Sequence, residues 1–155
     1  MDFIASYDSP LGKLTLSSDG EALTGLHFVT VFETRETDLP VFDAAKRWLD
    51  IYFNGVSPDF TPPLKLCGSA FRKAVWNILL TIPFGQTMTY GKIAAKFSDH
   101  MSAQAVGNAV GHNPIALIVP CHRVIGVNGK LTGYAGGVDK KIKLLELEKA
   151  DFRKK

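Results

Sequence analysis

The chain has few cysteines and no long apolar run, and these two features exclude several classes of protein. Its 155 residues include only two cysteines, Cys67 and Cys121. Two are too few for a disulfide framework or for a zinc site made of four thiolates. No apolar segment approaches the roughly 20 residues that a membrane-spanning helix needs. We therefore expect a globular protein with free thiols in a reducing compartment and no membrane association.

The N-terminus lacks the basic and apolar regions of a secretory signal, because it begins Met1-Asp2-Phe3. This predicts a cytoplasmic protein. Hydrophobic residues make up 46% of the chain, which is enough for a packed core. The length fits one domain, or two small subdomains that share an interface.

The net charge of +3 hides an asymmetry between the two parts of the chain. Residues 1–66 carry 5 Lys+Arg and 10 Asp+Glu, a net charge of −5, whereas residues 67–155 carry 13 and 5, a net charge of +8. A basic C-terminal part fits a polyanionic partner such as nucleic acid, although solvated lysine faces give the same count.

Alternating apolar residues near the N-terminus predict a three-stranded meander over residues 3–28, with turns at Asp8–Gly12 and Ser18–Gly20. Apolar residues at helical spacing then predict a helix over 41–52. The stretch 57–63 contains three prolines and serves as a linker. We therefore predict two domains.

Their expected boundaries are 1–63 and 64–155. In the second, helical spacing predicts helices over 71–82, 89–97 and 103–111. The last two are short and closely spaced, which is typical of a helix-turn-helix.

The helix expected over 103–111 consists mostly of Ala, Gly and Val. Such side chains read base edges in the major groove poorly. They do permit close approach, either to another helix in the protein interior or to the minor groove of DNA. The composition of this helix leaves both interpretations open.

The apolar run 115–119 predicts a buried strand that leads into Cys121. Asn128-Gly129 is a hairpin signal, and an amphipathic helix is expected over about 139–150. Cys67, before the first of the C-terminal helices, is interpreted as structural filler.

Cys121 is followed by His122 and Arg123. A thiol must lose its proton to attack carbon. An imidazole accepts that proton directly or through a water, and a nearby cation stabilises the thiolate. A carboxylate beyond the imidazole would orient it, and the acidic candidates late in the chain are Asp139, Glu146 and Glu148. The alternative is accidental adjacency, with Cys121 as core filler and His122 at the surface.

The string Pro120-Cys121-His122-Arg123-Val124, with Asn113-Pro114 before it and Tyr134 and Gly136-Gly137 after it, closely resembles the O6-alkylguanine-DNA alkyltransferase family. The similarity runs from about Phe71 to Glu148 and includes Ser9 to Leu14. It implies an α/β (α+β) fold. A ribonuclease H-like meander-plus-helix subdomain would precede a mostly helical subdomain that contains the helix-turn-helix and the active-site loop.

The resemblance also implies a function, the direct reversal of DNA damage. The protein would transfer the alkyl group of O6-alkylguanine, and in some members O4-alkylthymine, irreversibly to Cys121. His122 would take the thiol proton through a water and Glu148 would polarise His122. Asn113 would brace the turn, and Tyr90 would protonate the leaving guanine.

The remaining residues implied by the resemblance bind DNA or the flipped base. A flipped base is needed because the O6 substituent is inaccessible in stacked duplex DNA. The expected pocket consists of Val124, Ile125, Tyr134, Ala135 and Gly136. The expected DNA contacts, on the minor groove of double-stranded DNA, are Tyr90, Gln104, Ala105, Gly107, Asn108 and Arg123.

Two positions depart from the family pattern. Gln104 stands where the family usually has an arginine that fills the space left by the flipped nucleotide, and glutamine lacks the charge and stacking plane of a guanidinium. We therefore expect weaker flipping. Ala135 stands where some members have a serine, which removes one hydrogen bond to O6.

We expect no cofactor, no metal and a monomeric protein. Three alternatives remain for the function. A non-enzymatic alkyltransferase-like protein would replace the acceptor cysteine, which is present here. A helix-turn-helix regulator would carry base-reading side chains, and only Gln104 and Asn108 qualify. A Cys-His hydrolase would need an oxyanion hole, for which the sequence gives no sign.

Overall fold

The computed structural model describes residues 3–28, 36–131, 134 and 136–152, and the chain divides into two compact units. The first comprises residues 1–67 together with 114–116, and the second comprises 68–113 and 117–155. Each unit has its own buried apolar residues. No described helix is both long enough and apolar enough to cross a bilayer.

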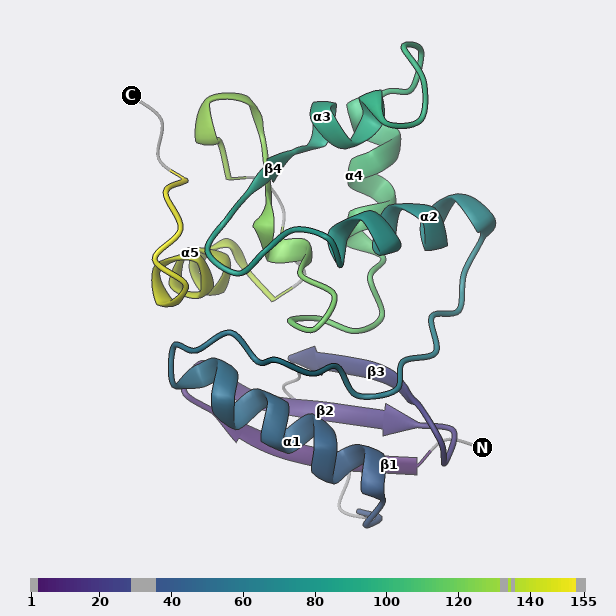
Figure 1. Cartoon of the computed structure of the whole chain (residues 1–155), viewed down its shortest axis with the longest axis vertical. Helices are drawn as coiled ribbons and strands as arrows, with labels where there is room; N and C mark the ends of the chain where they lie inside the picture. Colours follow the sequence, from purple (N-terminus) through teal and green to yellow (C-terminus); the bar gives the residue numbers. More distant parts are fainter. Residues whose placement is uncertain (1–2, 29–35, 132–133, 135, 153–155) are drawn as a thin grey trace. The chain divides into compact units, whose positions relative to one another are not determined.

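The first unit contains the predicted meander. Strands β1 (Phe3–Ser9), β2 (Gly12–Ser18) and β3 (Leu23–Phe28) pair antiparallel in the order β1-β2-β3. Helix α1 (Pro40–Phe53) lies along this sheet (Figure 1). The period-2 alternation of the strands and the helical spacing of 41–52 therefore predicted these elements correctly.

The apolar face of α1 and one face of the sheet form the core of this unit. Its fully buried side chains include Leu14, Leu16, Leu23, Leu26, Phe42, Leu49 and Tyr52. Residues 114–116 add to the edge of β3, because the Leu26 N–H donates to the Pro114 carbonyl at 3.0 Å and the Ala116 N–H donates to the Leu26 carbonyl at 2.9 Å. Three residues from late in the chain thus complete an early sheet.

The second unit is mostly helical, with α2 (Ala70–Leu79), α3 (Tyr90–Ala95), α4 (Ala103–Gly111) and α5 (Val138–Leu147). Helices α3 and α4 both begin at a side-chain cap. The Thr89 hydroxyl accepts from the Lys92 N–H at 3.1 Å, and the Ser102 hydroxyl accepts from the Ala105 N–H at 3.0 Å. Each such cap stabilises its helix by about 1 kcal/mol.

Helix α4 packs against both α3 and α2 (Figure 1). The Trp76 indole N–H donates to the Ala109 carbonyl at 2.8 Å, which joins α2 to α4. The connection between α3 and α4 covers residues 96–102 and is longer than the sequence suggested. Two parallel strands of two residues each, β4 (Met88–Thr89) and β5 (Val124–Ile125), hold the start of α3 beside the residues that follow Cys121.

The predicted strand over 115–119 is wrong. Ile115 makes a single bridge to β3, and the chain then turns through Leu117, whose φ is 70°. Left-handed φ is uncommon for a side chain of this kind. Burial was predicted correctly, because Leu117 and Val119 are inaccessible to solvent. A short apolar run therefore indicated the interior and not the conformation.

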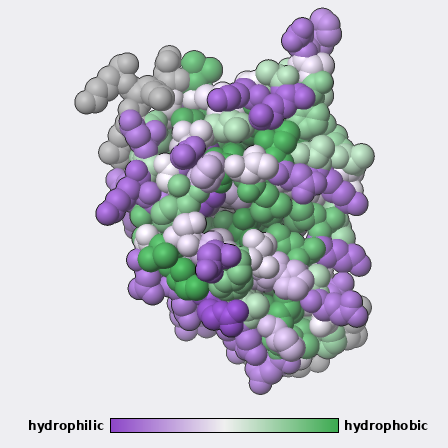
Figure 2. All heavy atoms as spheres, viewed as in Figure 1, coloured by the Kyte–Doolittle hydropathy of each residue, from purple (hydrophilic) through white to green (hydrophobic). Residues whose placement is uncertain are grey.

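Hydrophilic residues are spread over the visible face of the molecule, with hydrophobic residues between them (Figure 2). The large hydrophobic side chains with notable exposure are Phe3, Val56, Leu80, Val127 and Val138. Isolated apolar residues of this kind are normal on a protein surface.

Candidate active site

Cys121 begins a single 3-10 turn, η1 (Cys121–Arg123), and is only 9% exposed. Burial raises the pKa of its thiol, because the interior disfavours a thiolate. A hydrogen bond from Asn113 and the charge of Lys141 lower this pKa, but burial prevails. The resting residue is therefore a thiol, and it needs a base to become a nucleophile.

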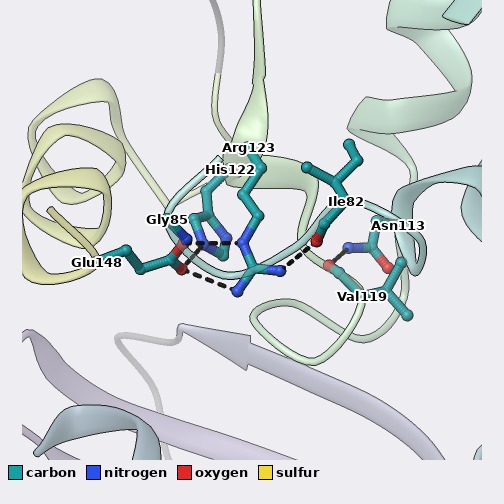
Figure 3. A network of polar contacts seen from close by, with 7 residues as sticks. All are labelled: Ile82, Gly85, Asn113, Val119, His122, Arg123 and Glu148. Carbon is teal, nitrogen blue, oxygen red and sulfur yellow. Dashed lines mark hydrogen bonds and ion pairs between the residues drawn. The ribbon is translucent and has the colours of Figure 1, made fainter. Parts of the chain in front are cut away.

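The turn before Cys121 is braced by Asn113, as the resemblance implied. Its side-chain amide donates to the Val119 carbonyl at 2.7 Å (Figure 3). The same carbonyl accepts from the Cys121 N–H at 2.8 Å. Both bonds go to the same carbonyl, so Asn113 and the backbone of Cys121 are held together across the buried turn.

His122 is fully buried, and its Nε2–H donates to Glu148 Oε2 at 2.6 Å (Figure 3). Burial lowers the pKa of His122, although the Glu148 carboxylate acts in the opposite direction. Because an ionised carboxylate can only accept, the proton of a neutral His122 must lie on Nε2. Its Nδ1 then carries a lone pair and can act as a base.

Glu148 caps the end of α5 and is only 3% exposed. Burial alone would raise the pKa of its carboxyl, but hydrogen bonds and charges from His122 and Arg123 bring that pKa to about 2. The carboxylate also accepts from the Gly85 N–H at 2.9 Å. It is ionised at any pH at which the protein would work.

Arg123 does not fit the predicted role of a DNA contact. It is 8% exposed, and its guanidinium binds Glu148 through Nε at 2.9 Å and through a terminal nitrogen at 3.1 Å. The other terminal nitrogen donates to the Ile82 carbonyl at 2.7 Å (Figure 3). All three guanidinium nitrogens are thus committed to the protein interior. The family resemblance implied a DNA contact for Arg123, and a buried arginine of this kind is uncommon.

Tyr90 begins α3 and lies at a junction of three helices. A Cβ built on Gly107 of α4 would be 3.7 Å from its ring, and Lys141 Nζ of α5 is 5.9 Å from the ring centroid. A methyl group at 107 would make ordinary van der Waals contact with this ring, so α4 lies close to Tyr90 at this position. Tyr90 also has partial solvent exposure, which a proton donor to a bound base requires.

Lys141 is a residue of this site that the sequence did not reveal. It is 1% exposed, and burial lowers the pKa of its ammonium to about 8. Its charge lowers the pKa of Cys121. A signal was present, because Lys141 precedes Leu144 and Leu145 at helical spacing and so shares the apolar face of α5.

The structure describes some of the expected pocket residues and not others. The Tyr134 hydroxyl is buried and has no hydrogen-bond partner among the residues described, and burial raises the pKa of Tyr134 well above its usual value. Gly136 lies in a turn closed by a 2.8 Å bond from the Gly137 N–H to the Tyr134 carbonyl. Ala135 lies outside the described residues.

Val124 and Ile125 are buried in β5. Ile125 packs in an apolar cluster with Leu145, Ala150 and Phe152. This position in the core does not fit a wall that contacts a bound base. The positions of Val124 and Ile125 directly after Cys121 could not distinguish core residues from pocket residues.

The four expected DNA-contacting residues of α4 fall on its more accessible side. Gln104 and Asn108 are exposed and Ala105 and Gly107 are partly exposed. The opposite side is buried through Val106, Ala109 and Val110. Helix α4 is therefore packed internally along one side and open along the other. The expectation of internal packing is confirmed for the buried side, and the approach of the open side to DNA stays a prediction.

Cys67 is exposed, so its interpretation as buried filler is wrong. Within the described ranges, no group of three or more His, Cys, Asp or Glu side chains is arranged to hold a metal ion. The expectation that the protein needs neither metal nor cofactor stays a prediction.

Two family models match the chain. The model described as "6-O-methylguanine DNA methyltransferase, ribonuclease-like domain" matches residues 3–66, and the model described as "6-O-methylguanine DNA methyltransferase, DNA binding domain" matches residues 70–150. Cys121, His122, Glu148, Asn113 and Tyr90 all lie in the second match.

Relatives of known name agree with these models. The chain is 49% identical over 148 residues to a methylated-DNA–protein-cysteine methyltransferase of Mycobacterium tuberculosis, covering 92% of this chain and 90% of that one. A protein of the same name from Methanosarcina acetivorans is 44% identical over 152 residues, covering 94% and 97%.

Solved structures give the same result. A crystal structure of the Mycobacterium tuberculosis O6-methylguanine methyltransferase is similar with a TM-score of 0.85 and 47% identity, covering 96% of this chain and 93% of that one. A structure of Mycobacterium tuberculosis OGT in complex with DNA is similar with a TM-score of 0.83 and 50% identity, covering 93% and 91%.

Proposed function

Because the chain belongs to the 6-O-methylguanine DNA methyltransferase family, we propose that it repairs O6-alkylguanine in DNA by transferring the alkyl group to its own Cys121. The observation that supports this most directly is the histidine that follows Cys121, because His122 is buried and is held by a 2.6 Å hydrogen bond to Glu148. A buried thiol beside a neutral, oriented imidazole is equipped for one nucleophilic displacement.

The proposed reaction forms one bond and breaks one. The Cys121 proton passes to Nδ1 of His122 through a water, and Glu148 stabilises the imidazolium that results. The thiolate sulfur then attacks the alkyl carbon, the bond from that carbon to O6 of guanine breaks, and a thioether remains. Guanine leaves as an anion and takes a proton at N3 from the Tyr90 hydroxyl.

The thioether is stable, so each molecule reacts once. The proposed pocket for the flipped base includes Tyr134, Gly136 and the turn that carries Cys121. Burial of the Tyr134 hydroxyl supports this role, because an unsatisfied polar group is costly unless a ligand completes it.

We propose that α4 engages the minor groove of double-stranded DNA through Gln104, Ala105, Gly107 and Asn108. The partial exposure of these small or neutral side chains supports close approach without sequence readout. The net charge of +8 over residues 67–155 supports attraction to the phosphate backbone.

We propose in addition that residues 64–155 carry both DNA binding and transfer, and that 1–63 form a separate α/β subdomain. The protein would act as a monomer, because one chain supplies every group in the proposed reaction. A cytoplasmic location would keep the acceptor thiol reduced.

The proposal is tested by the intact mass of the protein after incubation with an oligonucleotide that contains O6-methylguanine. We expect a gain of about 14 Da, from a methyl group that replaces the thiol hydrogen. Cys121→Ala should abolish the gain, and Cys67→Ser should retain it, because Cys67 is exposed and outside the site. Tight lesion binding without any mass change would instead support a non-enzymatic lesion-binding protein.

A further inference from the structure

The Glu148 carboxylate is shared between two cationic or potentially cationic partners. Oε1 accepts from the Gly85 N–H and from Arg123 Nε, both at 2.9 Å. Oε2 accepts from His122 at 2.6 Å and from a terminal nitrogen of Arg123 at 3.1 Å. Four donors occupy the roughly four lone-pair sites that a carboxylate offers. The carboxylate can therefore neither rotate nor move without losing a bond.

Arg123 binds this carboxylate and also the segment that contains Ile82 and Gly85. Its guanidinium binds both Glu148 oxygens and also the Ile82 carbonyl at 2.7 Å, and its central carbon lies 5.8 Å from the Phe84 ring centroid. The loop after α2, the turn η1 and the end of α5 thus meet at one side chain (Figure 3). A planar fork can make these bonds at once, whereas a lysine ammonium cannot.

The charge of Arg123 matters as much as its geometry. A buried imidazole that faced a carboxylate alone would be drawn toward the charged form. The charged form has no lone pair and cannot accept a proton. Arg123 offsets the charge of Glu148, and its field acts on His122 in the same direction as that of Lys141. Glu148 is the one group among these three that favours the imidazolium.

We propose that Arg123 is a positioning residue for alkyl transfer, which fixes the Glu148 carboxylate against His122 and keeps that histidine uncharged until it accepts the Cys121 proton. This inference rests on the proposed function. It replaces the expectation that Arg123 binds DNA.

The test measures the single-turnover rate of methyl transfer from an O6-methylguanine oligonucleotide between pH 5.5 and 9, for wild type, Arg123→Lys and Arg123→Gln. In Arg123→Gln the ratio of the rate at pH 8.5 to that at pH 6 should rise roughly tenfold over wild type, because His122 becomes charged more easily. Arg123→Lys keeps the charge but not the fork, so its rate should fall with little change in this ratio. A rate that falls by one factor at every pH in Arg123→Gln would contradict the proposal.

DNA affinity separates the proposal from the role expected from the sequence. The dissociation constant for an undamaged duplex should be the same for wild type and Arg123→Gln, and so should its salt dependence. A side chain that contacts phosphate would lower the salt slope by about one on removal. A weaker and less salt-dependent Arg123→Gln complex would therefore overturn the inference.

Arg123→Gln removes one partner of the buried Glu148 carboxylate and so could fail to fold. In that case a second comparison tests the proposal. Glu148→Gln leaves the Arg123 charge beside His122, and the double variant Arg123→Gln/Glu148→Gln removes both charges. The imidazole titration of His122, followed by NMR and assigned by its loss in His122→Asn, should lie at higher pH in the double variant than in Glu148→Gln. Coincident titrations would overturn the inference. This measurement needs no turnover, so it remains decisive even if wild type transfers no methyl group and the proposed function fails.

Discussion

The acceptor residue combines two opposing influences. Burial raises the pKa of the Cys121 thiol, while Lys141 and Asn113 lower it. A protected thiol resists oxidation and stray reaction, since it is the thiolate that reacts. The cost is that the residue depends on nearby groups to ionise when a substrate is bound. Those groups are therefore where single substitutions should have the largest effect on the reaction.

We expect Lys141→Met to slow methyl transfer at pH 7 by roughly tenfold, because removal of a nearby positive charge disfavours the thiolate. The pKa of Cys121, followed by thiolate absorbance in a Cys67→Ser background, should rise further. Lys143→Met is the matched control, since Lys143 is exposed on the same helix. An unchanged thiol pKa in Lys141→Met would show that the ammonium does not act on Cys121.

Sequence reasoning succeeded for residues whose chemistry is local and failed for those defined by distant partners. The adjacency of Cys121 and His122 could be stated in advance. Glu148 was one of three acidic candidates late in the chain, and only the family resemblance singled it out. The role of Arg123 could not, because it depends on the Ile82 carbonyl, which lies 41 positions away. Lys141 was missed although its helical spacing placed it among buried leucines.

Among the elements, α4 has the most divided role. Its buried side packs against α2 and α3, and its accessible side carries Gln104 and Asn108, one helical turn apart. Residues at this spacing share a helix face. A change at either position therefore alters the same surface without disturbing the packed side.

We expect Gln104→Arg to speed methyl transfer from duplex DNA by roughly two- to fivefold, because a guanidinium stacks on bases and is attracted to their faces. The measurement is the single-turnover rate on a duplex. Asn108→Arg adds the same charge to the same face and is the control. Equal acceleration by both would attribute the gain to charge alone, and a slower or unchanged Gln104→Arg would contradict the expected weakness of glutamine.

Secondary structure was predictable where periodicity was long and was not where it was short. The strands of the meander, α1 and the caps at Thr89 and Ser102 all follow from spacing and residue type. The run at 115–119 did not, because five apolar residues fit a strand and a buried turn equally well. Leu117 takes its left-handed φ from packing that no local pattern reveals.

At the scale of the whole molecule, the stability of the fold depends on pH partly through the same groups that form the site. His122 has a pKa below its ordinary 6.5, and Glu148 has a pKa of about 2 against an ordinary 4.5. In both cases the unfolded chain binds the proton more readily than the native protein. The free energy of unfolding therefore falls as pH decreases through these values.

We expect the urea midpoint to decline from about pH 6.5 downward, with a total loss of roughly 2–3 kcal/mol attributable to Glu148 by pH 2. Glu148→Gln should be less stable at pH 7, and its stability should fall less steeply below pH 4.5. Glu146→Gln removes the same charge from an exposed neighbour and should follow wild type. A wild-type midpoint equal at pH 7 and pH 4 would contradict this.

The short segment 114–116 has a consequence for how the chain could be cut. It supplies the hydrogen-bond partners of Leu26 at the edge of β3, although it follows α4 in sequence. A fragment that stops at residue 67 would lack this edge and would expose backbone groups that invite aggregation. Conversely, two fragments separated between 67 and 68 would each hold part of one sheet. Such halves should reassemble when mixed, so this site suits a split reporter whose signal depends on reconstitution.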